Sequence, residues 1–331
     1  MGCCASQNSD TTTKHYLCQR VKDAIDSCNS HKLTLLYKNN DSSPSIAKDL
    51  DQEIVTINSK RLNALAYCVH SGNTKMFKFL LSQGCSIASM ETLFSSQGMR
   101  AVNIICSKNF TELLQTYLPL YLQSSHPENS RTEYPIHSAC RAGSLGVIKF
   151  IQSYFSLKPV HPEFDIESVN ENDENSGLVA CRYGQLSTVK YLHDVCRINL
   201  KVLNKKGENA LLVCLHGYKH TPSLAYFDLV VYLVEEIGID LGYMYGDLIR
   251  SAENKEIADY LEAKLEKIGI YYRKNEIYDL TLAELSCECV EVNSFEDVLP
   301  FEQQVNKVLG KPQGYKYDSK MLTISQKLNK E

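Results

Sequence analysis

The sequence predicts an all-α protein built as a solenoid of short helix pairs that repeat about every 33 residues. Three observations support this fold class. Five cysteines recur at spacings of 38, 34, 41 and 33 residues inside apolar segments. A turn residue follows several of them at short range, and a second apolar segment of helical period comes next. The five are Cys68, Cys106, Cys140, Cys181 and Cys214.

One central unit carries a recognisable motif. The segment Tyr134–Gly143 reads YPIHSACRAG and resembles the ankyrin signature Thr-Pro-Leu-His-x-Ala, with its Gly nine residues after the first position. Asn63, Asn175 and Asn209 occupy that first position in other units. The resemblance implies an ankyrin-type helix-turn-helix array of about six or seven units, in which these polar residues cap each first helix. It also places His137 in a structural position in the turn.

By this register the units begin near residues 20, 63, 100, 134, 175, 209 and 245. The first and last are degenerate, which suits capping repeats that keep one face in water. The unit at 100 rests on spacing and apolar pattern alone. The turn residues expected between paired helices are Gly72, Asn109, Gly143 and Gly184. Insertions at 39–56, 156–172 and 216–224 are expected to form long loops or hairpins beside the short hairpin loops.

The N-terminus begins Met-Gly-Cys-Cys-Ala-Ser, a pattern typical of N-myristoylation at Gly2. One myristoyl chain binds a membrane only marginally, and palmitoylation of Cys3 and Cys4 would supply the second anchor. We therefore expect lipidation at Gly2, Cys3 and Cys4, with residues 1–14 acting as a flexible tether. Residues 15–268 form the predicted array.

Composition excludes several classes. The net charge of −4 argues against nucleic-acid binding, which needs a concentrated basic surface. No run of 18 apolar residues predicts a membrane-spanning helix. We expect the cysteines to be free thiols in a reducing compartment. We expect a monomer on the cytoplasmic face of a membrane, without a cofactor, a metal or a small-molecule substrate.

Catalytic patterns are absent, so the sequence predicts no enzyme. The outer spacing of His216 and His220 matches a zinc-protease motif, but Gly217 stands where the catalytic Glu must be, and loop decoration is the better interpretation. The alternative is a metal or thiol-redox protein with its chemistry at Cys287 and Cys289. These two lie in a tail, residues 269–331, that is acidic first and basic later; it is expected to be partly ordered and is either a solvated tail or a docking segment.

The family's concave surface binds proteins, and the resemblance implies a scaffold or adaptor whose protein partner stays unidentified. Outward positions of the first helices are the candidate anchors, because aromatic and arginine side chains dominate interface energetics. These candidates are Tyr67, His70, Arg141, Arg182, Tyr183 and His216.

Overall fold

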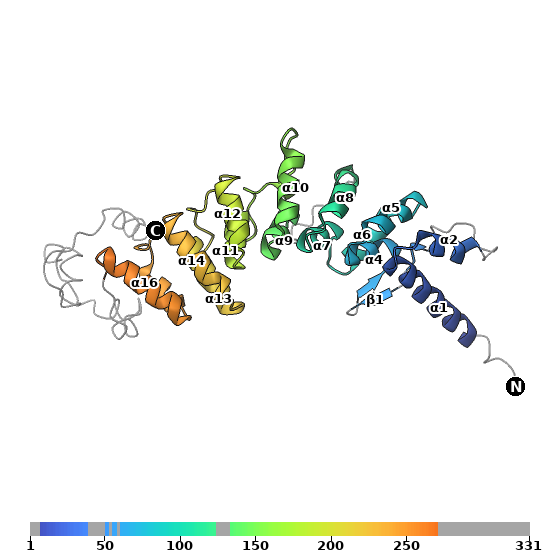
Figure 1. Cartoon of the computed structure of the whole chain (residues 1–331), viewed down its shortest axis with the longest axis horizontal. Helices are drawn as coiled ribbons and strands as arrows, with labels where there is room; N and C mark the ends of the chain where they lie inside the picture. The colour runs from blue at the N-terminus through green and yellow to red at the C-terminus, as the bar shows by residue number, and fades with distance from the viewer. Residues whose placement is uncertain (1–6, 39–49, 53–54, 58–59, 124–132, 271–331) are drawn as a thin grey trace, which may run out of the picture. The chain divides into compact units, whose positions relative to one another are not determined.

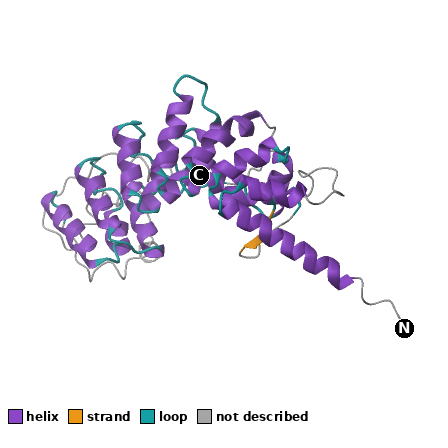
Figure 2. Ribbon diagram, turned by 45° about the vertical axis from the view of Figure 1, so that its right-hand side comes forward, coloured by secondary structure: helices purple, strands orange, loops and turns teal. Residues whose placement is uncertain are grey.

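The computed structural model describes residues 7–38, 50–52, 55–57, 60–123 and 133–270. The chain divides into two units, Met1–Tyr271 and Tyr272–Glu331, and every described residue belongs to the first. Within these residues the chain is helical apart from one small hairpin (Figure 2). The predicted all-α class is confirmed. The tail after residue 270 lies outside the described residues.

Short helices come in pairs joined by tight turns, in chain order (Figure 1). A pair at the start, α1 (Gln7–Asp26) and α2 (Ser30–Lys38), precedes six further pairs. The first helices of these six are α4 (Ala64–Ser71), α7 (Ala101–Ser107), α9 (Pro135–Ala142), α11 (Ser176–Arg182), α13 (Ala210–His220) and α15 (Tyr245–Ser251). The second helices are α5 (Thr74–Ser82), α8 (Thr111–Gln123), α10 (Leu145–Phe155), α12 (Leu186–Asp194), α14 (Ala225–Glu235) and α16 (Lys255–Lys267).

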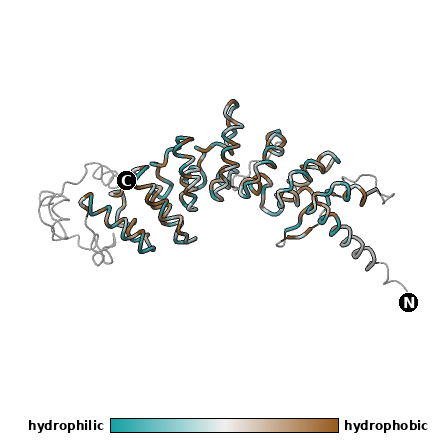
Figure 3. The backbone as a smooth tube through the Cα atoms, in the orientation of Figure 1, coloured by the Kyte–Doolittle hydropathy of each residue, from teal (hydrophilic) through white to brown (hydrophobic). Residues whose placement is uncertain are grey.

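First helices pack on first helices, and second helices pack on second helices. Each first helix contacts the first helix of the next pair, from α4 through to α15. Among the second helices, α5 contacts α8, α8 contacts α10, and α14 contacts both α12 and α16. Hydrophobic and hydrophilic positions alternate along these helices (Figure 3). A short two-helix unit cannot bury both of its apolar faces alone, so the neighbouring pairs form one continuous core.

Asparagine caps begin three of the first helices, as the sequence predicts. The side chains of Asn63, Asn175 and Asn209 accept hydrogen bonds from the backbone N–H groups of Ala66, Leu178 and Leu212. An oxygen acceptor at this point satisfies one of the otherwise unpaired donors of the first turn. These caps fix where each first helix starts.

The predicted turn residues adopt left-handed backbone conformations. Gly72, Gly143 and Gly184 have φ values of 73°, 70° and 67°, and Asn109 has 58°. Glycine and asparagine tolerate this region, in which a side chain with a bulky Cβ is strained. The chain can therefore reverse within a few residues between paired helices.

The five recurring cysteines lie in the core between first helices. Each is fully buried, and burial raises the pKa of every one of these thiols. A buried protonated thiol packs as a small hydrophobic group and is chemically inert. The prediction that these cysteines serve packing is confirmed.

Three segments differ from the prediction. Helix α1 begins at Gln7, inside the segment 1–14 that the sequence predicts as a flexible tether; a helix nucleated at its packed end extends at low cost. Residues 216–220 continue α13 instead of forming a loop, and only 221–224 connect it to α14. An additional helix, α6 (Ile87–Ser96), follows α5.

The other two insertions contain short elements. A hairpin stands at the end of the first: strand β1 (Val55–Ile57) overlaps its last two residues, and β2 (Lys60–Leu62) follows and pairs with it antiparallel, with Val55 opposite Leu62. The second holds one turn of 3-10 helix, η1 (Pro162–Phe164). The expectation of a hairpin or long loop at each place agrees with this structure.

Candidate protein-binding surface

Four of the six predicted anchors occupy equivalent places on the first helices α4, α9, α11 and α13. His70, Arg141, Arg182 and His216 each stand seven residues after the helix's capping position. Ser107 on α7 and Ser251 on α15 occupy the same place. We call these six positions the first-helix row.

Three glutamates accompany the row. Glu133, Glu174 and Glu208 each directly precede the capping residue of α9, α11 and α13. Each contacts the row residue of its own helix: Glu133 pairs with Arg141 at 2.8 Å, Glu174 pairs with Arg182, and the Glu208 carboxylate lies 3.0 Å from Nδ1 of His216. The chain therefore carries its own carboxylate at three consecutive places.

Two loops hold the second and third glutamates with the same set of bonds. In 170–175 the Asn170 side-chain oxygen accepts from the backbone N–H of Glu174, and the Asn170 amide donates to that carboxylate at 3.2 Å. In 204–209 the Asn204 oxygen accepts from the Glu208 N–H, and its amide donates to Glu208 at 2.7 Å. This repeated Asn–Glu bracket orients each carboxylate before it meets a basic side chain.

Arg182 is half-buried and already paired within the protein, so it is less available than an outward-facing position predicts. Its guanidinium donates to Glu174 from Nε at 3.0 Å and from Nη2, and it lies 3.6 Å from Glu208. The Glu174 side chain is 2% exposed and that of Arg182 is 23% exposed. Burial alone would raise the pKa of Glu174, but its hydrogen bonds and the charge of Arg182 outweigh burial and lower it.

Tyr67 is buried, contrary to prediction, because α1 packs against α4. Its hydroxyl donates to the Asp26 carboxylate at 2.5 Å, and the Lys22 ammonium lies 5.5 Å from its ring centre. The sequence register could not reveal this cover, since it describes each helix without its neighbours.

Arg141 and Tyr183 are the exposed part of the surface. The Arg141 side chain is 43% exposed, and its guanidinium carbon lies 6.0 Å from the ring centre of Tyr183, which is 39% exposed. Glu133 pairs with the arginine from one side. An arginine held over an aromatic ring loses little conformational freedom on binding, which suits an interface anchor.

The two histidines of the row are half-buried. His216 Nε2 lies 3.1 Å from the Ser251 hydroxyl, which links α13 to α15. Burial lowers the pKa of His70, and the positive charges of Lys108 and Lys60 lower it further. The binding role of all six residues stays a prediction.

His137 has a structural role. It is fully buried, donates from Nε2 to the carbonyl of Ser168 at 2.8 Å, and stacks on Tyr134 with ring centres 5.6 Å apart. Burial lowers its pKa. Its position in the turn agrees with the prediction.

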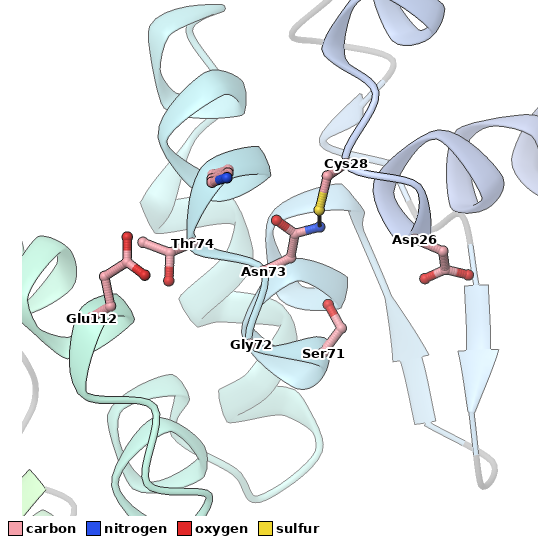
Figure 4. Close-up of a pocket in the computed structure, with 8 residues that line it drawn as sticks. Asp26, Cys28, Ser71, Gly72, Asn73, Thr74 and Glu112 are labelled. Carbon is pink, nitrogen blue, oxygen red and sulfur yellow. Dashed lines mark hydrogen bonds between the residues drawn. The ribbon is translucent and has the colours of Figure 1, made fainter. Parts of the chain in front are cut away.

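A groove of 410 Å³ lies between the end of α1 and the α4–α5 turn (Figure 4). Asp26 and Cys28 line one side, and Asn73 faces the Cys28 thiol at 3.1 Å. The Asn73 oxygen caps α5, and its amide also donates to the carbonyl of Ile25. The polar groups at its centre thus bond within the protein, and the groove holds none of the predicted anchors.

Sequence reasoning missed a polar anchor in the 156–172 insertion. Glu163 of η1 pairs with Arg100 at 2.7 Å and accepts from the Tyr121 hydroxyl at 2.5 Å. Phe164 is buried beside Tyr121 and Phe155. The insertion is thereby fixed against α7 and α8. Charge complementarity between Arg100 and Glu163 was visible, but their separation of 63 residues gave no reason to pair them.

No protein-family model matches this chain, and a search of curated proteins finds no match. Among the helices of the described residues, none combines the length and the apolar character needed to cross a bilayer. Gly2, Cys3, Cys4, Cys287 and Cys289 lie outside the described residues.

Proposed function

We propose that the protein is a membrane-tethered scaffold or adaptor of ankyrin type that binds protein partners through its first-helix row. The observation that carries the proposal is the recurrence of one arrangement along the chain. First helices pack on first helices from α4 through α15, left-handed turns recur in four successive pairs, and asparagine caps begin three of the first helices. Such repetition presents equivalent side chains side by side, and repeat arrays use surfaces of this kind for binding.

The proposed contact surface is centred on Arg141 and Tyr183. Both are exposed, they belong to neighbouring repeats, and the Arg141 guanidinium lies over the Tyr183 ring. Arg182 and Tyr67 do not contribute directly, since they are engaged within the protein. Lipid at Gly2, Cys3 and Cys4 would concentrate this surface at the cytoplasmic face of a membrane.

Affinity capture from the native membrane tests the binding proposal. We expect Arg141→Ala with Tyr183→Ala to reduce partner recovery at least about tenfold, as loss of an interface hot spot does. The matched control is Lys149→Ala with Tyr191→Ala, a pair with the same cation-over-ring arrangement at 5.4 Å between second helices. Equal recovery with the first variant and the wild type would refute the proposed surface.

A further inference from the structure

A glutamate contacts some of the basic residues in the first-helix row but not others. On α9, α11 and α13 each basic row residue meets a glutamate from the position before the capping residue. On α4 and α7 that position holds Leu62 and Met99. Leu62 is 1% exposed and packs in the core. The repeats of α4 and α7 therefore have no carboxylate at the position where the next three have one.

Two lysines and a histidine lie close together in this part of the chain. Lys60 lies on β2, His70 on α4, and Lys108 directly after α7. The Lys108 ammonium donates to the carbonyl of His70 at 2.6 Å, and the Lys60 ammonium lies 2.8 Å from the sulfur of Met99. We call these residues the Lys60–His70–Lys108 cluster.

Among the described residues, the two lysine charges of this cluster have no carboxylate partner. Both lysine residues are exposed. An exposed cation beside a second cation gains free energy when an anion binds between them.

We propose that the Lys60–His70–Lys108 cluster binds a carboxylate side chain of the protein partner. The partner would supply at this end of the row the carboxylate that Glu133, Glu174 and Glu208 supply farther along. This inference rests on the proposed function, because it extends the same row toward α4. It adds the chemical nature of the partner: an acidic segment that lies along the row.

A protein carboxylate fits this place better than a polyanion does. The same row binds glutamate three times within the chain, at distances of 2.8 to 3.0 Å where the pair is Glu133–Arg141 or Glu208–His216. A nucleic acid or a broad lipid surface needs an extended basic area, whereas the next repeats of the row already carry glutamates. The missing group is therefore a single carboxylate in a defined position.

Binding of fluorescein-labelled poly-L-glutamate to the full chain tests the proposal. The chain carries Gly2→Ala so that acyl groups do not contribute. We expect Lys60→Gln with Lys108→Gln to weaken binding about tenfold at low ionic strength. Lys149→Gln with Lys190→Gln, which removes two exposed lysine charges from the second helices α10 and α12, should leave it near the wild-type value.

A second pair of variants installs the missing counterion. Met99→Glu places a carboxylate where the later repeats have theirs and should weaken poly-L-glutamate binding to a similar extent. Met99→Gln changes the shape similarly without adding charge and should retain binding. Far-UV circular dichroism would verify that all variants stay folded.

Two results would overturn the inference. One is an equal loss of binding with both lysine pairs, which would show a general charge effect. The other is binding to phosphatidylserine vesicles that depends on Lys60 and Lys108 in the absence of poly-L-glutamate binding, which would assign the cluster to lipid. Neither result affects the capture experiment on Arg141 and Tyr183, so the two proposals fail separately.

Discussion

Of the three glutamates that accompany the row, Glu174 is the one whose removal should destabilise the protein most. Its carboxylate accepts from Arg182 and from the amides of Asn170 and Asn204, and its side chain is 2% exposed. Glu174→Ala leaves a guanidinium that is 23% exposed without its main partner. Two amides lose an acceptor as well.

The size of the effect follows from burial. Breaking a buried ion pair by deleting one partner costs about 3 to 5 kcal/mol, because the remaining charge is left uncompensated. Glu208 remains 3.6 Å from Arg182 and offsets part of this loss. We therefore expect about 3 kcal/mol, the lower end of that range.

Urea unfolding followed by far-UV circular dichroism measures this difference. Glu133→Ala is the matched control, since Glu133 precedes the capping residue of the previous repeat and pairs with the equivalent arginine. That pair is far more exposed, at 27% for Glu133 and 43% for Arg141, so its loss should cost at most about 1 kcal/mol. Equal losses for the two variants would refute the argument from burial.

The same carboxylate gives a pH dependence with a definite sign. Its folded-state pKa lies below the ordinary value of 4.5. Its stabilisation is therefore present above that value and is lost as the pH falls through the folded-state pKa. The difference in unfolding free energy between the wild type and Glu174→Ala should shrink over this acidic window and stay constant from pH 6 to 8, roughly two units above the ordinary value and beyond.

Two further results are expected from the same account. Gly217→Ala should destabilise by several kcal/mol, since the added Cβ would collide with a backbone carbonyl of α11, whereas Gly246→Ala meets open space and should be neutral or stabilising in urea unfolding. Gly2→Ala should move the protein from the membrane to the soluble fraction, and Cys3→Ser with Cys4→Ser should leave weak binding that washing removes. A Gly2→Ala protein that stays on membranes would contradict the proposed anchor.

Local features of the fold were predictable because they depend on neighbours in the sequence. Asn63, Asn175 and Asn209 cap helices through bonds that span three residues. Gly72 and Asn109 reverse the chain through their own backbone conformation. Features that depend on residues only a few positions apart can be predicted from the sequence.

The exposure of the candidate anchors was less predictable, because distant segments determine it. Tyr67 is covered by a helix that begins 60 residues earlier. Arg182 is enclosed by glutamates on two separate loops. A register along one helix identifies which side chains point away from its own core, but it does not show what another part of the chain places over them. Arg141 and Tyr183 stayed exposed because no such segment covers them among the described residues.

Site-specific photo-crosslinking tests most directly whether the first-helix row contacts a protein partner. A photoreactive phenylalanine analogue would replace Tyr183 in one protein and Tyr191 in another, and both would be irradiated on the native membrane. Our account requires a crosslinked partner at position 183 and none at position 191. Crosslinking at 191 alone would place the contact on the second helices and contradict the central claim.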